Sequence, residues 1–282
     1  MIQWFPGHMA KARREMEEKL QLVDVVVELV DARAPQASEN PMLHDVTRDK
    51  RKIKVLMKKD LADPSITEEW IQCFKQQQQI AIAIDVNEKS DIPKLTQLIK
   101  ETGIENQRKM IEKGVKERPV RALVAGVPNV GKSTLINRFA NKKIAVIGDR
   151  PGVTKKQQWI KVKNQFELLD TPGILWPKFE EPLTGTNLAI IGTIKEELIP
   201  QQDVVAHLLT YMGEHYPAFL KERYQLEMQE DMWENFTQIG KRRGALESGG
   251  IVDIDKVAEL VLRDFRSGKL GRVTLERIKK EA

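Results

Sequence analysis

The fold of this chain is indicated by a short stretch near its middle, which reads Gly126-Val127-Pro128-Asn129-Val130-Gly131-Lys132-Ser133. It follows an apolar run at residues 120–125 and precedes a helical pattern at residues 132–140. The pattern Gly-x-x-x-x-Gly-Lys-Ser between a strand and a helix is typical of a phosphate-binding loop. Its glycines let backbone N–H groups turn inward around phosphate oxygens, and the helix presents its positive end there. The sequence therefore predicts a nucleotide phosphate site in an α/β fold.

Each residue type in this loop has a predicted task. We expect the Lys132 ammonium to reach the outer phosphates and the Ser133 hydroxyl to bind Mg²⁺. The predicted phosphate contacts from the loop and the first helical turn are Asn129, Val130, Gly131, Lys132, Ser133 and Thr134. The expected ligand is a nucleoside triphosphate with Mg²⁺ as cofactor.

A second motif selects among the phosphate-loop enzymes. The apolar run at residues 166–169 ends in Asp170-Thr171-Pro172-Gly173. Asp-x-x-Gly after a strand resembles the GTPase box in which Asp170 holds the Mg²⁺ shell and the Gly173 amide contacts the γ-phosphate. Thr154, in a loop between the two motifs, is the candidate switch threonine that closes on Mg²⁺. The pair of motifs favours a GTPase over a kinase or an ATPase.

The guanine box Asn-Lys-x-Asp is missing downstream of Gly173 and stands upstream instead, as Met57-Lys58-Lys59-Asp60. It follows the apolar run at residues 53–57. We expect Asp60 to accept hydrogen bonds from guanine N1 and N2, and the Lys58 stem to cover the base. Met57 replaces the usual Asn, which predicts the loss of one polar contact on the base side.

The remaining pattern predicts two domains. Apolar runs at residues 23–30, 53–57, 80–84, 120–125 and 166–169 are typical of buried parallel strands. They alternate with helical stretches such as residues 92–113, and residues 103–119 are interpreted as the end of a helix and a connector. This alternation predicts that residues 1–176 form a doubly wound α/β domain, with helices on both faces of a mostly parallel sheet. Residues 177–282 have helical periodicity and are predicted to be a small all-α domain. One of its helices is expected to begin at Asp253 or Asp255 and to end near Gly268.

Composition excludes several classes of protein. The chain has 282 residues, 46 Lys and Arg against 41 Asp and Glu, and 41% hydrophobic residues, which suffices for ordinary cores. The one cysteine excludes internal disulfides and a Cys-rich metal site. No apolar run approaches the ~18 residues of a membrane span, and the N-terminus lacks the pattern of a secretory signal, so we expect a cytoplasmic protein. Basic residues at 241–243, together with Arg263, Arg266, Lys269 and Arg272, suit phosphate contacts with a nucleic acid.

The order of these motifs is that of a circularly permuted GTPase. The chain also opens with Trp4-Phe5-Pro6-Gly7-His8-Met9, carries Asp31-Ala32-Arg33-x-Pro35, and continues its Asp-x-x-Gly box as Ile174-Leu175-Trp176-Pro177. Together these motifs resemble the ribosome biogenesis GTPase A family, also called YlqF, over essentially the whole chain.

The resemblance implies a late role in assembly of the large (50S) ribosomal subunit, with a C-terminal helical domain that binds rRNA. It implies GTP and GDP as ligands, potassium-stimulated hydrolysis with Asn129 as a K⁺ ligand, and neither a membrane nor DNA as a partner. Many GTPases orient the attacking water with a Gln after Asp-x-x-Gly, but this chain has Ile174 there, which has no hydrogen-bonding group. In the family the histidine of the opening motif is proposed for this task, which makes His8 the catalytic candidate.

Two other functions remain open from the residues alone. One is a phosphate-loop kinase or ATPase with an RNA or small-molecule acceptor, which nucleotide competition would separate from a GTPase. The other is an RNA-binding scaffold that uses GTP as a structural ligand without hydrolysing it. A turnover assay would exclude this scaffold.

Overall fold

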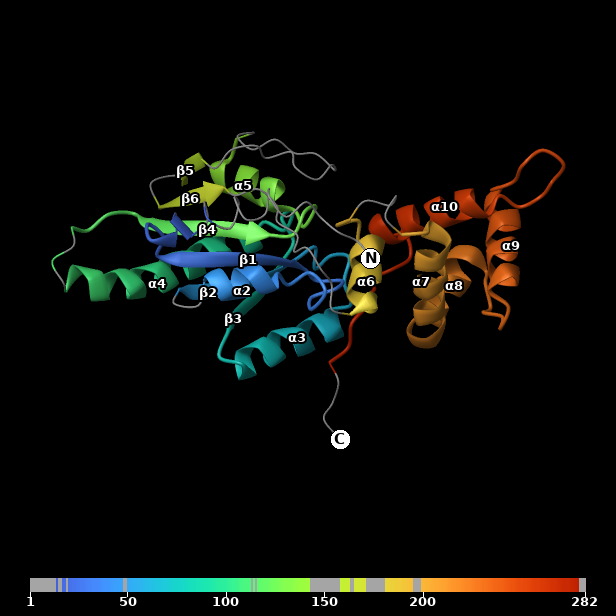
Figure 1. Ribbon diagram of the computed structural model, residues 1–282, viewed down its shortest axis with the longest axis horizontal. Helices are drawn as coiled ribbons and strands as arrows, with labels where there is room; N and C mark the ends of the chain where they lie inside the picture. Colours follow the sequence, from blue (N-terminus) through green and yellow to red (C-terminus); the bar gives the residue numbers. More distant parts are fainter. Residues whose placement is uncertain are drawn as a thin grey trace.

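A computed structural model of the chain describes residues 14, 17–18, 20–47, 50–112, 114, 116–142, 158–162, 165–170, 181–194 and 199–278, with the side chains of residues 109, 110, 158 and 170 left aside. A β-sheet flanked by helices forms one end of the elongated molecule, and a group of helices forms the other (Figure 1). The fold is therefore α/β with helices at the C-terminus, as predicted.

The sheet has strand order β3-β2-β1-β4-β6-β5. All pairs are parallel except β5 with β6. The strands are β1 (Val25–Asp31), β2 (Arg51–Met57), β3 (Ile80–Ile84), β4 (Val120–Gly126), β5 (Gln158–Val162) and β6 (Phe166–Asp170). The apolar runs predicted as strands are therefore confirmed, and no strand end differs from its predicted position by more than two residues.

Helices cover both faces of the sheet, and the alternation of side chains along β1 shows how. Val25, Val27 and Leu29 share a core with α4 (Asp91–Ile111) and α5 (Lys132–Ala140). The intervening Val26 and Val30 face the opposite side, against α2 (Pro41–Val46) and α3 (Pro64–Gln76) respectively. A strand that is buried on both faces reads as a continuous apolar run, which explains why these strands could be predicted.

Strand β5 was not predicted, because its pattern is different. Trp159 and Lys161 are exposed, whereas Ile160 and Val162 are buried. Such half-burial is typical of an antiparallel strand at a sheet edge. Helices α2 and α3 also went unpredicted, although Asn40 and Asp63 cap their N-termini and a proline follows each cap.

The helices after the sheet are α6 (Pro182–Ile190), α7 (Gln201–His215), α8 (Pro217–Tyr224), α9 (Met232–Arg243) and α10 (Ile254–Arg266). Helix α10 begins after Asp253, whose side chain accepts from the Lys256 amide, and its last residue precedes Ser267 and Gly268. Both predicted ends of this helix are thus confirmed.

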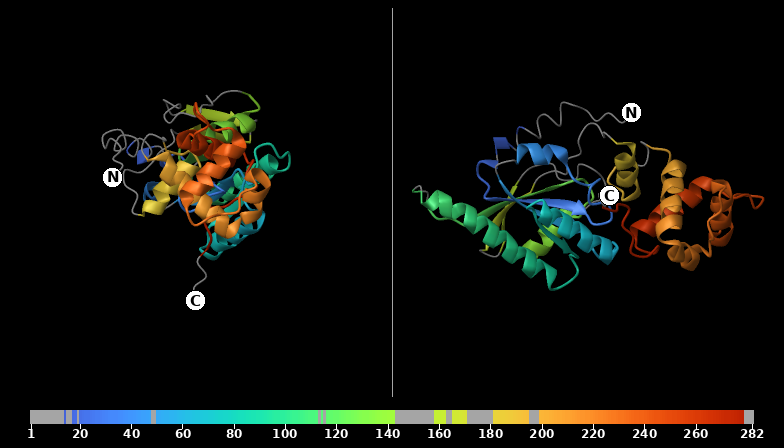
Figure 2. Two further views of the ribbon diagram at one scale, coloured as in Figure 1. Left: turned by 90° about the vertical axis from the view of Figure 1, so that its right-hand side faces the viewer. Right: turned by 90° about the horizontal axis from the view of Figure 1, so that it is seen from below.

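After α10 the chain returns towards the sheet, past α6 and the N-terminal end of α3 (Figures 1 and 2). Leu275 donates its amide to the Arg33 carbonyl oxygen at 2.7 Å, two residues after the end of β1. We call residues 271–278 the C-terminal strap. None of the helices that the structure describes has the length and apolar composition required to cross a lipid bilayer.

Candidate functional site

The predicted motifs meet at one edge of the sheet. Asp31 at the end of β1 lies opposite Met57 at the end of β2, and Leu29 lies opposite Gly126 at the end of β4. On the other side of β4, Val124 lies opposite Asp170, the last residue of β6. Because parallel strands all end at this edge, the loops that follow them form the crevice where open α/β sheets bind ligands.

The phosphate-binding loop has the backbone that its glycines predict. Gly131 adopts φ 103°, a conformation that side chains disfavour. A Cβ on Gly126 would come within 2.6 Å of the Leu29 carbonyl oxygen, so only glycine lets β4 leave the sheet so close to β1. Helix α5 begins directly after this loop without a side-chain cap. First-turn amides of a helix have no partner within the helix, so they are suited to donate to phosphate oxygens.

Each loop residue holds a definite position. Val130 is buried, Lys132 is 7% exposed, and Ser133 and Thr134 lie partly exposed in the first turn of α5. The loop therefore anchors itself by Val130 and presents Ser133 and Thr134 at the helix N-terminus.

Met57 differs from its predicted role. Its side chain is 1% exposed and belongs to the core, with its Cε at 3.1 Å from the place where a Cβ of Gly131 would stand. The residue thus packs under the phosphate-binding loop and does not face the base side. Apolar packing replaces the polar contact expected of an Asn here.

Lys58 joins the predicted guanine box to the predicted phosphate loop. Its backbone adopts φ 60°, and its Nζ donates to the Asn129 carbonyl oxygen and to Asp31 Oδ2, both at 2.9 Å. Burial lowers the pKa of Lys58, while the nearby Asp31 carboxylate opposes that change. The predicted guanine box and the predicted phosphate loop are therefore in direct contact.

Asp31 and Arg33 form a buried ion pair behind Lys58. The guanidinium donates from Nε to Asp31 Oδ1 at 2.8 Å and from Nη2 to Oδ2 at 2.7 Å, and both side chains are at most 2% exposed. Burial would raise the pKa of Asp31, but the charges of Arg33 and Lys58 outweigh it and hold that pKa far below its usual range. In the sequence these two residues carried only the family resemblance. The structure shows that they support the Lys58 ammonium.

Asp60 is exposed at the tip of the loop after β2. We call residues 58–63 the guanine loop. Burial of part of the carboxyl group and the nearby Asp85 raise the pKa of Asp60, while Arg33 and Arg272 oppose that shift. Lys59 Nζ lies 2.5 Å from Asp91 Oδ2, and the same oxygen accepts from the Asp85 amide at 2.9 Å. The loop after β3, where the second guanine box was sought, is thus tied to the guanine loop.

Asn129 faces the helical part of the molecule. It adopts φ 61°, and its Nδ2 donates to the Gly192 carbonyl oxygen at 2.8 Å, just after α6. Arg33 Nη2 reaches the preceding carbonyl, that of Ile191, at 3.5 Å. The end of α6 is therefore attached to the loop that would hold the phosphates.

For two residues of one basic cluster, Arg266 and Arg272, the interpretation as nucleic-acid contacts needs correction. Arg266 donates to the Ala189 and Ile190 carbonyl oxygens, at 2.7 and 3.0 Å. Arg272 donates to the Lys59 and Ala62 carbonyl oxygens, at 2.7 and 2.9 Å. Both guanidinium groups are thus used within the molecule. The partners of both residues are distant in the chain, so the periodicity of the local sequence could not reveal these contacts.

Several predicted site residues lie outside the described residues: His8, Thr154, Gly173 and the side chain of Asp170. The backbone of Asp170 ends β6, next to β4. It therefore lies at the same sheet edge as Ser133, as a shared Mg²⁺ site would require. A hydroxyl and a carboxylate are oxygen donors of the kind that Mg²⁺ prefers, so this pair fits that ion.

Sequence reasoning did not predict that the C-terminal strap meets the site. Glu276 accepts from the Gln36 and Ala37 amides at 2.6 and 2.9 Å, and from Asn187 Nδ2 at 3.1 Å. Burial raises the pKa of Glu276 to about 7. Nothing in the local pattern around Glu276 marks it, because its partners are backbone amides far away in the chain.

Known proteins match this chain both in sequence and in structure. A family described as 50S ribosome-binding GTPase matches residues 121–238. Ribosome biogenesis GTPase A of Bacillus cereus is 53% identical over 277 residues, which cover 98% of this chain and 94% of that protein. The Thermotoga maritima protein of the same name is 32% identical, again over 98% of this chain and 94% of the relative.

Solved structures agree with the sequence matches. The crystal structure of GNP-bound YlqF from T. maritima superposes with a TM-score of 0.65 at 29% identity, and the match covers 95% of this chain and 98% of that one. A GDP-bound structure of YlqF matches with the same TM-score and identity. The similarity thus spans both the sheet and the helices that follow it.

Proposed function

The chain belongs to the ribosome biogenesis GTPase A family, and we propose that it binds and hydrolyses GTP as an assembly factor of the large (50S) ribosomal subunit. In this proposal it binds the subunit through rRNA, in a manner that depends on the bound nucleotide. Its circularly permuted GTPase domain spans residues 1–176 and its ribosome-binding helical domain spans residues 177–282.

The observation that carries this proposal is the contact between Lys58 and the Asn129 carbonyl at 2.9 Å. A phosphate loop alone suits ATP as well as GTP. Because the Lys-x-Asp box contacts that loop, the base of a nucleotide whose phosphates lie in the loop would be near residues 58–60, and we assign Asp60 to bind it. A carboxylate accepts the two donors of guanine, N1–H and the 2-amino group, whereas adenine presents an acceptor at N1. This chemistry favours GTP and GDP over adenine nucleotides.

The phosphate side would stabilise charge on the transferred group. First-turn amides of α5, the Lys132 ammonium and the Gly173 amide would hold the phosphates. Ser133, Thr154 and Asp170 would hold Mg²⁺, which neutralises charge on the phosphate oxygens when bound. Since Ile174 cannot orient water, we assign that task to His8. K⁺, bound with the help of Asn129, would supply additional positive charge.

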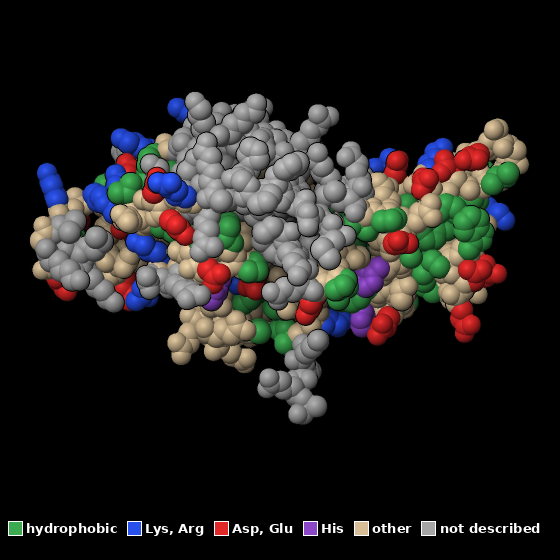
Figure 3. Space-filling model, in the orientation of Figure 1, with side chains coloured by type: hydrophobic (Ala, Val, Ile, Leu, Met, Phe, Trp, Pro, Cys, Tyr) green, Lys and Arg blue, Asp and Glu red, His purple; other side chains and the backbone are tan. Residues whose placement is uncertain are grey.

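The surface that would meet rRNA lies at the far end of the helical part. Lys241, Arg242 and Arg243 are exposed in the last turn of α9. Hydrophobic side chains also gather at the surface of this end, on the right in Figure 3, and Trp233, Leu246 and Ile251 are exposed there. Trp233 lies in the first turn of the same helix, so this end of the molecule carries both cations and an exposed aromatic ring, which suit a nucleic-acid backbone and its unstacked bases respectively. Since bacterial ribosomes assemble in the cytoplasm, we place the protein there.

A turnover assay tests the proposal. We expect GTP hydrolysis in Mg²⁺ to rise on addition of purified large subunits and to be faster in KCl than in NaCl. ATP at the same concentration should be neither bound nor hydrolysed. Equal competition by ATP would favour the ATPase or kinase alternative, and tight GTP binding without turnover in any of these mixtures would favour the scaffold.

A further inference from the structure

The C-terminal strap holds the guanine loop by its backbone. The Arg272 guanidinium donates from Nη2 to the Lys59 carbonyl oxygen at 2.7 Å and from Nε to the Ala62 carbonyl oxygen at 2.9 Å. The Val273 amide donates to the carbonyl oxygen of Leu61 at 3.0 Å. Three carbonyl groups that surround Asp60 are therefore bound by residues that follow the last helix.

The loop holds itself only weakly. Its internal bonds run from the Leu61 amide to the Lys58 carbonyl oxygen at 3.0 Å and from the Ala62 amide to the Lys59 carbonyl oxygen at 3.4 Å. The second of these is long for a backbone hydrogen bond. Arg272 donates to that same Lys59 oxygen, so its guanidinium reinforces the turn at its weakest point.

The strap is itself anchored on both sides of this contact. Thr274 is fully buried, and its Oγ1 accepts from the Asp63 amide at 3.1 Å, at the end of the guanine loop. Trp70 Nε1 donates to the Glu276 carbonyl oxygen at 3.0 Å. On the other side, a Cβ on Gly268 would stand 2.7 Å from Leu61 Cδ2, so the turn after α10 packs closely on the loop. Anchors of this kind keep Arg272 in one place.

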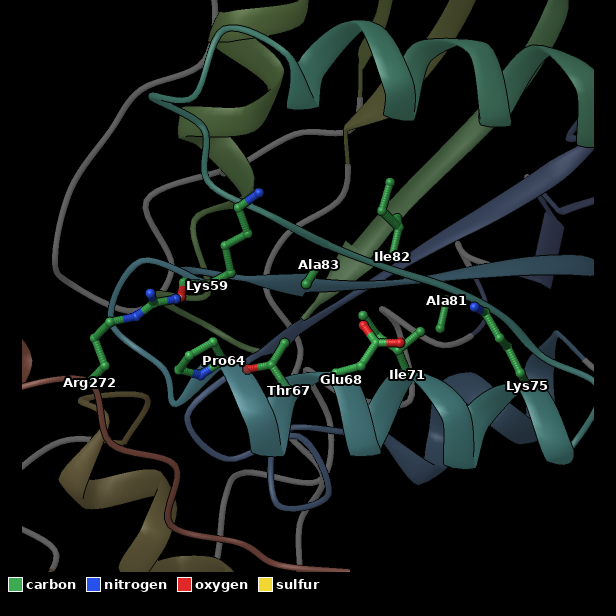
Figure 4. Close-up of a pocket in the computed structure, with 10 residues that line it drawn as sticks. All are labelled: Lys59, Pro64, Thr67, Glu68, Ile71, Lys75, Ala81, Ile82, Ala83 and Arg272. Atoms are coloured by element: carbon green, nitrogen blue, oxygen red, sulfur yellow. The ribbon is translucent and has the colours of Figure 1, made fainter. Parts of the chain in front are cut away.

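Figure 4 shows the position of Arg272 from the side of α3. Its guanidinium extends from the strap towards the backbone at Lys59, at one end of a cavity of about 390 Å³ between α3 and β3. The Lys59 ammonium points the other way, and it pairs with Asp91. Two cationic side chains thus hold the guanine loop. Arg272 binds its backbone, and Lys59 links it through Asp91 to the loop after β3.

We propose that Arg272 is a positioning residue for guanine recognition, which fixes the loop that carries Asp60 from the C-terminal strap. This inference rests on the proposed function, because it takes Asp60 as the group that accepts the guanine N1 and N2 donors. A carboxylate must lie within about 3 Å of both donors to accept both, so a loop shift of an ångström loses one of them. The charge of Arg272 also favours the ionised form of Asp60, because it opposes the rise in the pKa of that carboxyl.

The test compares GDP with IDP, whose base lacks the 2-amino group. We expect Arg272→Met to weaken GDP binding by about tenfold, the loss of one hydrogen bond to a charged group. IDP, which offers Asp60 only N1–H, should lose less, so the ratio of GDP to IDP affinity contracts. A residue that merely stabilises the fold would lower both affinities equally. Arg272→Lys retains the charge but donates from one nitrogen instead of two, and we expect an intermediate ratio.

Arg277→Met is the matched control. Arg277 belongs to the same strap, is also exposed, and lies over the ring of Tyr216, a residue of the helical part of the molecule, at 5.6 Å from the ring centre. We expect it to keep the wild-type ratio of GDP to IDP affinity. A wild-type ratio in both Arg272 variants, or the same contraction in Arg277→Met, would overturn the inference.

Asp60→Asn separates this inference from the proposed function. Asn presents one acceptor and one donor, which match N1–H and the 2-oxo group of xanthine, so this variant should prefer XDP to GDP. If Asp60→Asn leaves the base preference unchanged, the guanine loop is misassigned, and the role of Arg272 is wrong with it. If Asp60→Asn changes the preference while the Arg272 variants do not, the loop is correctly assigned and only the inference about Arg272 is wrong.

Discussion

Lys58 Nζ donates to the backbone oxygen of Asn129 at 2.9 Å, although the two residues lie 71 positions apart in the chain. The bond joins the loop after β2 to the loop after β4, and the same ammonium is bound to the buried Asp31 carboxylate. The loop proposed to bind the base and the phosphate loop are therefore joined by one side chain. A nucleotide that spans them would meet two surfaces whose spacing is already set, which lowers the entropic cost of binding.

Lys132→Ala should weaken GTP binding at least about 100-fold, because a cation in contact with phosphates contributes several kcal/mol when it is largely desolvated. Fluorescence anisotropy with a labelled GTP analogue measures the loss. Lys142→Ala, an exposed position just after α5, is the control and should bind as the wild type does. Micromolar affinity retained in Lys132→Ala would contradict the assignment of the phosphate loop.

Met57→Asn should destabilise the protein, although Asn is the usual residue of the guanine box. The side chain is 1% exposed under Gly131, so the change buries an amide in an apolar site at a cost of about 1–3 kcal/mol. Met57→Leu, which conserves volume and polarity, should cost less than about 1.5 kcal/mol. Urea unfolding of the three proteins compares them, and an Asn variant as stable as the wild type would show that the amide finds a partner in the loop.

Glu276 should make stability depend on pH. Its pKa is raised by burial from 4.5 to about 7, and amide donors only partly offset that burial. An acid whose pKa is higher in the folded protein binds more protons there, so its contribution to the free energy of unfolding is full below pH 4.5. The contribution is then lost as the pH rises to about 7. The expected change is at most about 3 kcal/mol.

Glu276→Gln removes this titration. The wild type should therefore lose stability relative to the variant as the pH rises from 4.5 to 7.5. The unfolding free energies of the two proteins across this range measure the change. A constant difference would mean that the amide donors from residues 36 and 37 hold the carboxylate ionised throughout.

Asn129→Gly should weaken the link between nucleotide and ribosome. The Asn129 side chain binds the Gly192 carbonyl after α6, and its φ of 61° suits glycine, so the change removes the bond without straining the loop. We expect the wild type to bind large subunits about 5- to 150-fold more tightly with a non-hydrolysable GTP analogue than with GDP. In the variant this ratio should shrink.

Co-sedimentation with large subunits at saturating nucleotide measures both ratios. Asn129→Ala, which also removes the bond but strains a positive φ, should show the same smaller ratio together with lower stability. Equal subunit binding with the GTP analogue and with GDP in the wild type would refute the nucleotide dependence itself. An unchanged ratio in both variants would show that the signal reaches α6 by another route.

Much of the fold could be predicted from local pattern. Strands β1, β2, β3, β4 and β6 are rich in apolar residues because helices cover both faces of the sheet, so a few consecutive residues suffice to predict each strand. The phosphate loop is equally local, because Gly126 and Gly131 are required by backbone geometry that no other residue type satisfies as well. Half-buried β5 lacked that signal.

The support of the site is different in kind. Arg272 and Lys59 are 213 residues apart, and Glu276 and Gln36 are 240 apart. In these bonds one partner is a backbone carbonyl or amide, which every residue has, so no residue type marks the position. From the sequence, Met57 indicates only that a polar contact is lost. Its packing against Gly131 is visible only in the structure. A residue whose type and local motif together indicate its role, such as the lysine of the phosphate loop, could be predicted from the sequence. The contacts that orient them depend on how distant segments pack, because a hydrogen bond depends on distance in space and not on separation in sequence.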